Sequence, residues 1–202
     1  MTETKLKEIV ESLDGWCSYD KASTLHNLVL EEKPNLIVEL GVYGGRSLVP
    51  MALAQIENKK GTIIGIDPWL AEASLEGAHS TQSIGGWGGV KNTDYSYIYE
   101  RCVNKIIEYN LNNCELIRMK SQEAISLFVD NSIDVLHQDG NHSEDLATIE
   151  VELYMQKLKS GGYWISDDIH FDTIKKSLLL IKEHCDLVYE NLENPFAIFK
   201  KR

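Results

Sequence analysis

The sequence predicts an α/β fold in which a mostly parallel sheet carries helices on both faces. Short apolar runs alternate along the chain with segments of helical periodicity, and this alternation is typical of parallel sheets covered by helices. A glycine-rich turn follows the first apolar run, and acidic residues end several later ones. Because open α/β sheets bind ligands beyond the carboxyl ends of their strands, we expect a ligand site at that edge.

Each expected element comes from its own pattern. Residues 4–31 predict two helices that end before Pro34 and cap the mouth of the domain, so residues 1–33 form an N-terminal helical cap. The last two apolar runs flank a short polar connection and predict an antiparallel hairpin at a sheet edge. The expected strands are 36–40, 62–66, 115–118, 133–137, 163–166, 186–189 and 196–200, with helices from 47, near 95–111, from 121, from 143 and near 171–183.

Residues 69–94 interrupt the alternation. The segment holds five glycines and Trp87 and shows no convincing periodicity. Loops of this length in a compact domain are functional lids or disordered insertions, and the sequence leaves both readings open. The remaining pattern is continuous, so we expect residues 1–202 to form a single domain.

Composition excludes several classes of protein. The formal charge is −11 and the lysine-rich stretches are short and separate, so we expect no nucleic-acid partner. Four cysteines lie far apart without a CxxC pair, and the first residues lack the apolar core of a signal peptide, which indicates a cytoplasmic protein with reduced thiols. Apolar stretches are far shorter than the roughly 20 residues that span a bilayer, so we expect no membrane segment.

The turn after the first strand has the sequence ELGVYGGRS, residues 39–47. Glycines allow a ligand to approach the backbone closely, and the following helix offers free N–H groups at its start. The spacing is GxxGG rather than the GxGxxG of dinucleotide sites, and an acid that close suits the cationic amino end of a ligand better than a diphosphate. The candidate binding residues are Glu39, Gly41, Tyr43, Gly45 and Ser47.

Asp67 ends the second predicted strand, where a carboxylate can accept both hydroxyls of a ribose. Its alternative role is a turn-forming aspartate before Pro68. With the glycine turn, it describes a nucleoside that carries an amino acid. Ser121 and Gln122 follow the third strand and either contact an adenine ring or begin a helix as its N-cap.

Two later strands end in acids and histidines, in the segments DVLHQDGNH and SDDIH. Neighbouring acids repel each other, so a cation that neutralises them would explain the pattern, and oxygen ligands favour Mg²⁺ or Mn²⁺. The candidate metal ligands are Asp139, Asp167 and Asp168, and the accompanying histidines are His142 and His170.

Four motifs carry a family resemblance in this order and spacing: ELGVYGGRS, GIDPW with Asp67, DVLHQDGNH and SDDIH. They resemble class I S-adenosylmethionine-dependent methyltransferases, most closely the metal-dependent macrolide sugar O-methyltransferases and the cephalosporin hydroxylase-like proteins. The resemblance covers about residues 15–200. It implies a Rossmann-like methyltransferase sandwich with a seven-stranded sheet of order 3-2-1-4-5-7-6 and an antiparallel last strand. It also implies Mg²⁺ on the three aspartates, with His170 as the first candidate for the base and His142 as the second.

The resulting hypothesis is a Mg²⁺-dependent O-methyltransferase that acts on a hydroxyl of a small molecule, such as a sugar or a glycosylated natural product. Trp69 and Trp87 could close over the substrate, with Trp16 and Tyr19 on the opposite wall, or all four could pack ordinarily. The alternatives are a non-catalytic S-adenosylmethionine-binding protein and a nicotinamide-dependent oxidoreductase. The chain lacks the N-terminal region that builds the macrolide enzymes' oligomer, so whether it forms a homo-oligomer is left open.

Overall fold

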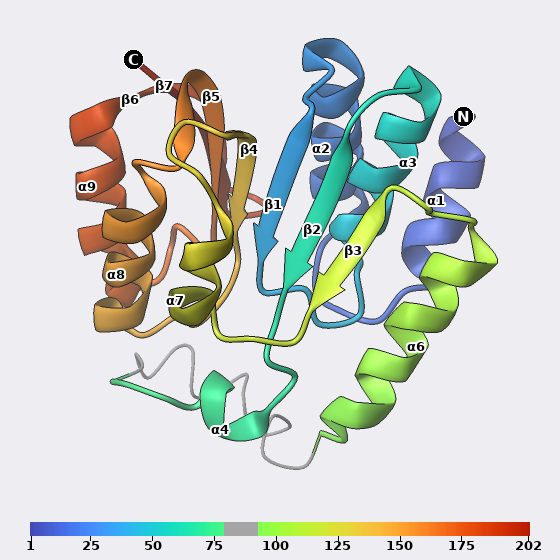
Figure 1. The fold of residues 1–202 in the computed structure, drawn as a ribbon, viewed down its shortest axis with the longest axis horizontal. Coiled ribbons are helices and arrows are strands. Elements are labelled where there is room, and N and C mark those ends of the chain that lie inside the picture. Colours follow the sequence, from blue (N-terminus) through green and yellow to red (C-terminus); the bar gives the residue numbers. More distant parts are fainter. Residues whose placement is uncertain (79–92) are drawn as a thin grey trace.

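Seven strands form one sheet with the order β3-β2-β1-β4-β5-β7-β6 (Figure 1). The computed structural model describes residues 1–78 and 93–202. Strands β1 to β5 pair in parallel, whereas β7 runs antiparallel to both β5 and β6. The predicted order and the reversed last strand are therefore confirmed. The strands are β1 Leu36–Leu40, β2 Thr62–Ile66, β3 Cys114–Ile117, β4 Ile133–Gln138, β5 Leu158–Asp167, β6 Cys185–Asn191 and β7 Phe196–Lys201.

Helices cover both faces of this sheet (Figure 1). Residues of α1, α2, α3 and α6 share one apolar core with one face, and residues of α7, α8 and α9 share a second core with the other. The short α4 lies beyond the carboxyl ends of the strands. The helices are α1 Glu3–Glu11, α2 Tyr19–Glu32, α3 Leu48–Asn58, α4 Ala71–Ser74, α6 Tyr95–Glu108, α7 Ser121–Ala124, α8 Glu144–Tyr154 and α9 Lys175–His184.

Successive strand residues divide between the two cores. In β4, Val135 faces the core under α2 and α3, and Leu136 faces the core under α8. In β5, Ile165 and Trp164 divide in the same way. Side chains alternate across a strand, so residues two positions further along the chain return to the same face. This period decides which polar side chains meet at the ends of the strands.

Two elements differ most from their predicted extent. Strand β5 begins at Leu158, five residues before the predicted start. The prediction missed this first half because the Ser-Gly-Gly stretch shows no strand periodicity, and the pairing of β5 with β4 shifts register there. The helix that begins at Ser121 is a single turn followed by a 3₁₀ turn, Ile125–Leu127. In this first turn, the Ser121 carbonyl accepts a hydrogen bond from the Tyr154 hydroxyl at 2.7 Å.

The N-terminal segment forms two helices at the predicted positions. Helix α2 packs along α3 and ends at a left-handed cap, Lys33, directly before Pro34. Within the segments 1–78 and 93–202, no helix combines the length and apolar character needed to cross a membrane. All four cysteines are free thiols.

His26 of α2 makes the stability of the α2–α3 packing depend on pH. Burial lowers the pKa of the imidazole, with the Glu57 carboxylate at 3.8 Å as a weaker opposing influence. The folded state therefore binds fewer protons than the unfolded chain below about pH 6.5. The free energy of unfolding that the neutral His26 contributes is lost as the pH falls through that range. We expect the free energy of unfolding to depend less on pH between about 5 and 7 in His26→Gln than in wild type. Urea unfolding across that range measures the difference, and parallel pH profiles would contradict it.

Candidate functional site

A cavity of about 450 Å³ opens at the carboxyl edge of the sheet. This volume falls within the range of small-molecule sites. Its walls come from the turns after β1, β2, β4 and β5, the start of α2, and the turn between β6 and β7. The predicted residues that line it are Gly41, Tyr43, Ser47, Asp67, Ser121, Gln122, Asp139, His142, Asp167, Asp168 and His170.

Asp67 ties the glycine turn to the end of β2. Its Oδ2 accepts the backbone N–H groups of Val42 and Tyr43 at 3.0 and 2.9 Å, and its Oδ1 accepts that of Trp69 at 2.7 Å. Burial raises the pKa of this carboxyl, and the three hydrogen bonds oppose the rise. The turn-forming role is therefore confirmed, and the residue also lines the cavity, where its contact with a ribose stays a prediction. A carboxylate has about four acceptor positions, so one remains for a ligand hydroxyl.

Gly41 brings the two halves of the cavity into contact. Its backbone is left-handed, with φ of +85°, and a Cβ built there would lie 2.0 Å from the carbonyl oxygen of Asp139. The β1 turn and the β4 turn therefore touch backbone to backbone, which only glycine allows. The binding turn and the first acid of the later motif are positioned by the same contact.

Glu39 does not line the cavity, contrary to the sequence prediction. It is completely buried behind the glycine turn, where its Oε1 accepts a hydrogen bond from the Ser47 hydroxyl and lies 2.6 Å from His137 Nδ1. Gly45 is also absent from the cavity wall and lies against Cys102. Both residues therefore lie behind the turn and outside the cavity wall.

Ser121 and Gln122 line the cavity beyond β3. The N-cap of α7 is Lys120, and the Ser121 hydroxyl instead donates to Glu150 Oε1 at 2.6 Å. The capping role is therefore wrong for Ser121. Glu150, which sequence reasoning missed, is buried in α8 and also lines the cavity, and burial raises the pKa of its carboxyl.

Lys21 lies between two of the predicted metal ligands. Its Nζ is 3.4 Å from Asp139 Oδ2 and forms a closer ion pair with Asp167 Oδ2. Only 4% of the side chain is exposed. Sequence reasoning missed this residue, although a signal was present: Lys21, Leu25 and Val29 recur at helical spacing and are all buried, so a lysine stands in an apolar stripe.

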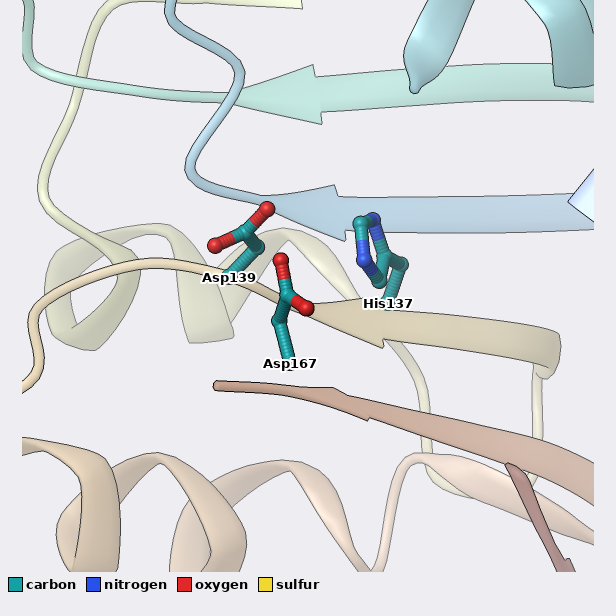
Figure 2. Close-up of side chains that lie close together, drawn as sticks. All are labelled: His137, Asp139 and Asp167. Carbon is teal, nitrogen blue, oxygen red and sulfur yellow. The ribbon is translucent and has the colours of Figure 1, made fainter. Parts of the chain in front are cut away.

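A row of polar side chains lies on the same face of the sheet. Glu39 and His137 are paired in the register of β1 and β4, and Asp167 ends the neighbouring β5 (Figure 2). Each follows a residue of the core beneath α2 by two positions, and the strand period therefore turns all three toward α2. His137 was also missed, because a histidine inside an apolar strand carries no sequence signal of its own.

The described side chains do not assemble the predicted three-aspartate metal site. Two groups have ligand atoms within 4.8 Å of one another: one joins Asp139 and Asp167 with His137, and the other joins Asp139 and Asp168 with His142. No described group contains all three aspartates. An ion in the first group would adjoin the Lys21 ammonium. Unit charges about 4 Å apart interact by about 4 kcal/mol at an effective dielectric of 20, and a divalent ion doubles that repulsion.

The ion pairs set the charges of this cluster. Burial alone would lower the pKa of Lys21, but the charges of Asp139 and Asp167 outweigh it and raise that pKa. Lys21 therefore remains an ammonium and cannot serve as a general base. Burial likewise acts to raise the pKa of Asp167, but the Lys21 charge prevails and lowers it. Burial and the Asp167 charge raise the pKa of Asp139.

Asp168 turns away from its neighbour Asp167 toward the histidines. Its backbone is left-handed, with φ of 49°, a conformation that aspartate tolerates better than most residues. Its Oδ2 lies 2.8 Å from His142 Nε2, and its Oδ1 lies 3.8 Å from His170 Nδ1. His142 is buried, whereas 47% of the His170 side chain is exposed beside the cavity. Asp168 therefore lies within hydrogen-bond distance of the buried imidazole and faces the accessible one at a longer distance.

The aromatic residues divide between the cavity and the core. Trp16 lines the cavity and stacks near Tyr43, with ring centroids 4.7 Å apart. Tyr19 instead packs in a small cluster between α1 and α2. Trp69 is buried and donates to the Tyr43 carbonyl at 2.8 Å, so the lid prediction is wrong for this residue. Trp87 lies outside the described residues, as does most of the predicted lid loop.

The sheet order, the glycine turn and the acid after β2 define the class I methyltransferase fold. Consistent with this, the profile of the methyltransferase domain family matches residues 38–169. The chain belongs to this family.

Solved structures agree in fold. The O-methyltransferase from Bacillus cereus in complex with SAH superposes with a TM-score of 0.65 at 14% identity and covers 100% of this chain and 92% of its own. TomG from Streptomyces achromogenes, an O-methyltransferase involved in tomaymycin synthesis and solved with SAM, gives 0.65 at 12% identity, covering 98% and 88%. The SAH-bound methyltransferase PaMTH1 from Podospora anserina gives 0.65 at 12% identity, covering 99% and 87%.

A viral protein is also similar in sequence. An uncharacterized protein, R132, from Acanthamoeba polyphaga mimivirus is 29% identical over 170 residues, which cover 81% of this chain. The match spans 66% of the viral protein's length.

Proposed function

We propose that this chain is an S-adenosylmethionine-dependent O-methyltransferase that methylates a hydroxyl of a small molecule, such as a sugar or a glycosylated natural product. The observation that carries the proposal is a single cavity lined both by the glycine turn with Asp67 and by the Asp168–His170 pair. The first set suits a nucleoside with an amino acid, and the second suits proton removal beside it. Structural neighbours named as O-methyltransferases and solved with SAM or SAH support this choice.

The cavity residues fit the proposed cofactor. The close backbone approach at Gly41 suits its methionine part, the remaining acceptor position on Asp67 suits its ribose, and Ser121 with Gln122 would lie near its adenine. S-adenosylmethionine, when bound, supplies a methyl group on a positively charged sulfur. The formal charge of −11 also supports a small acceptor in preference to nucleic acid. A cytoplasmic location is part of the proposal and is supported by the four unpaired cysteines.

His170 is the proposed general base. Its Nδ1 faces Asp168, which favours a proton on that nitrogen and leaves Nε2 to accept the acceptor's hydroxyl proton. The oxygen then forms its bond to the methyl carbon as the carbon–sulfur bond breaks. Because the charge on sulfur is neutralised as the methyl moves, orientation by the cavity walls is the main contribution that we assign to the protein. The predicted Mg²⁺ or Mn²⁺ has no part in this proposal, since Lys21 pairs with two of its three ligands.

Calorimetric titration with S-adenosylhomocysteine tests the cofactor. We expect Asp67→Asn to weaken binding at least about tenfold, because a charge-assisted hydrogen bond contributes about 1.5–3 kcal/mol. The same replacement also weakens the glycine turn, so it needs a control with a similar structural cost.

Asp134→Asn is that control. Asp134 Oδ2 accepts two backbone N–H groups, from Asn35 and Leu36, both at 2.9 Å, yet Asp134 lies near the start of β4 and outside the cavity. We expect this variant to bind S-adenosylhomocysteine like wild type. Equal affinity of both variants would remove Asp67 from the binding site, and no binding to wild type would overturn the proposed function.

A further inference from the structure

The Lys21 ammonium lies at the acidic edge where the resemblance places a divalent cation. It pairs with one oxygen each of Asp139, which directly follows β4, and Asp167, which ends the adjacent β5. The two carboxylates lie close together at the ends of β4 and β5 (Figure 2). Without a cation between them, these two partly buried carboxylates would repel each other.

The lysine is built into the fold. Helix α2 fixes it at one end of a buried stripe that continues through Leu25 and Val29. Its Nζ lies 6.0 Å from the centre of the Phe196 ring, and Phe196 is paired with Asp167 in the register of β5 and β7. The ammonium is therefore positioned by helix α2, by the Phe196 ring of the sheet and by its two ion pairs, unlike a solvated surface lysine.

The position leaves the ammonium able to act on a ligand. Lys21 lines the cavity. An ammonium has three N–H donors, and the two carboxylates account for two of them. The third can donate to an oxygen of a bound molecule. A single fixed positive charge can therefore both neutralise the acids and bind an oxygen, which are two of the functions of a divalent ion at such a site.

We infer that the ammonium of Lys21 takes the place of the divalent cation, so that this protein binds its ligands without a metal ion. The inference rests on the proposed function only for the identity of the ligands. The pairing of Lys21 with Asp139 and Asp167 concerns this chain's own residues and does not depend on that function. Metal binding can therefore be tested apart from any methyl transfer.

The experiment titrates wild type and Lys21→Met with Mn²⁺, by calorimetry and by thermal unfolding. We expect wild type to show no binding and no change in Tm at millimolar Mn²⁺. Lys21→Met leaves two carboxylates unneutralised, and we expect it to unfold at a lower temperature and to regain Tm as Mn²⁺ is added. Adding Asp167→Asn to that variant should abolish the regained Tm.

Lys159→Met is the matched control. Lys159 Nζ lies 2.6 Å from Asp134 Oδ1, outside the cavity. We expect this variant to gain no response to Mn²⁺. If Lys21→Met does not fold, Lys21→Gln replaces it with a side chain that still donates hydrogen bonds. Wild-type binding of Mn²⁺ that Asp167→Asn abolishes would overturn the inference, as would a folded Lys21 variant that binds no Mn²⁺. Failure to bind S-adenosylhomocysteine would instead count against the proposed function.

Discussion

Replacing Gly41 with alanine is expected to destabilise the protein by about 2–5 kcal/mol and to abolish cofactor binding. The left-handed backbone conformation costs a residue with a Cβ roughly 1–2 kcal/mol. The new methyl group would also meet the Asp139 carbonyl at 2.0 Å, and overpacking of this kind typically costs about 1–3 kcal/mol. The turns after β1 and β4 must then separate, and the cavity opens between its two halves. Urea unfolding and S-adenosylhomocysteine titration measure the two effects.

Gly161→Ala separates backbone strain from the contact. Gly161 also has a left-handed backbone, with φ of +77°, but a Cβ there meets nothing within 4 Å. We expect this variant to lose about 1–2 kcal/mol and to bind the cofactor normally. If the two alanine variants were equally stable, the contact between the β1 and β4 turns would not constrain the site.

Replacing His170 with alanine is expected to lower kcat by about 10²–10⁴-fold, the range typical of a lost general base, while the affinity for S-adenosylhomocysteine stays unchanged. The physical reason is its position: it is accessible beside the cavity and faces Asp168 through Nδ1. The measurement is transfer of a labelled methyl group to an acceptor found by screening hydroxylated compounds. Binding of S-adenosylhomocysteine, measured in parallel, shows whether the cavity is intact.

The control for this variant is His184→Ala. His184 ends α9, is exposed, and does not line the cavity. We expect wild-type turnover. His142 provides the competing assignment, because its Nε2 lies 2.8 Å from the same carboxylate. If His170→Ala kept full turnover and His142→Ala lost it, the base would be His142.

Local patterns were sufficient for most of the fold. Strands β1 and β2 begin and end where the apolar runs do, because each run is short, apolar and bounded by turn residues. The Asn-Glu-Pro connection also predicted the hairpin of β6 and β7. The first half of β5 was missed, since its Ser-Gly-Gly stretch has no strand preference of its own and lies where the pairing with β4 shifts register, between Leu158 and Tyr163.

The site, like the fold, was determined partly by local sequence and partly by tertiary packing. By itself the sequence determined which turns line the cavity, because parallel strands bring their carboxyl ends to one edge wherever the helices lie. Only the tertiary structure decided the neighbours of each side chain: Glu39 faces His137 behind the turn, and Lys21 reaches the acids from a helix more than a hundred residues away in sequence. Spacing along a strand fixes the face on which a side chain lies, whereas charge pairing across elements depends on how a helix packs, which no local pattern encodes.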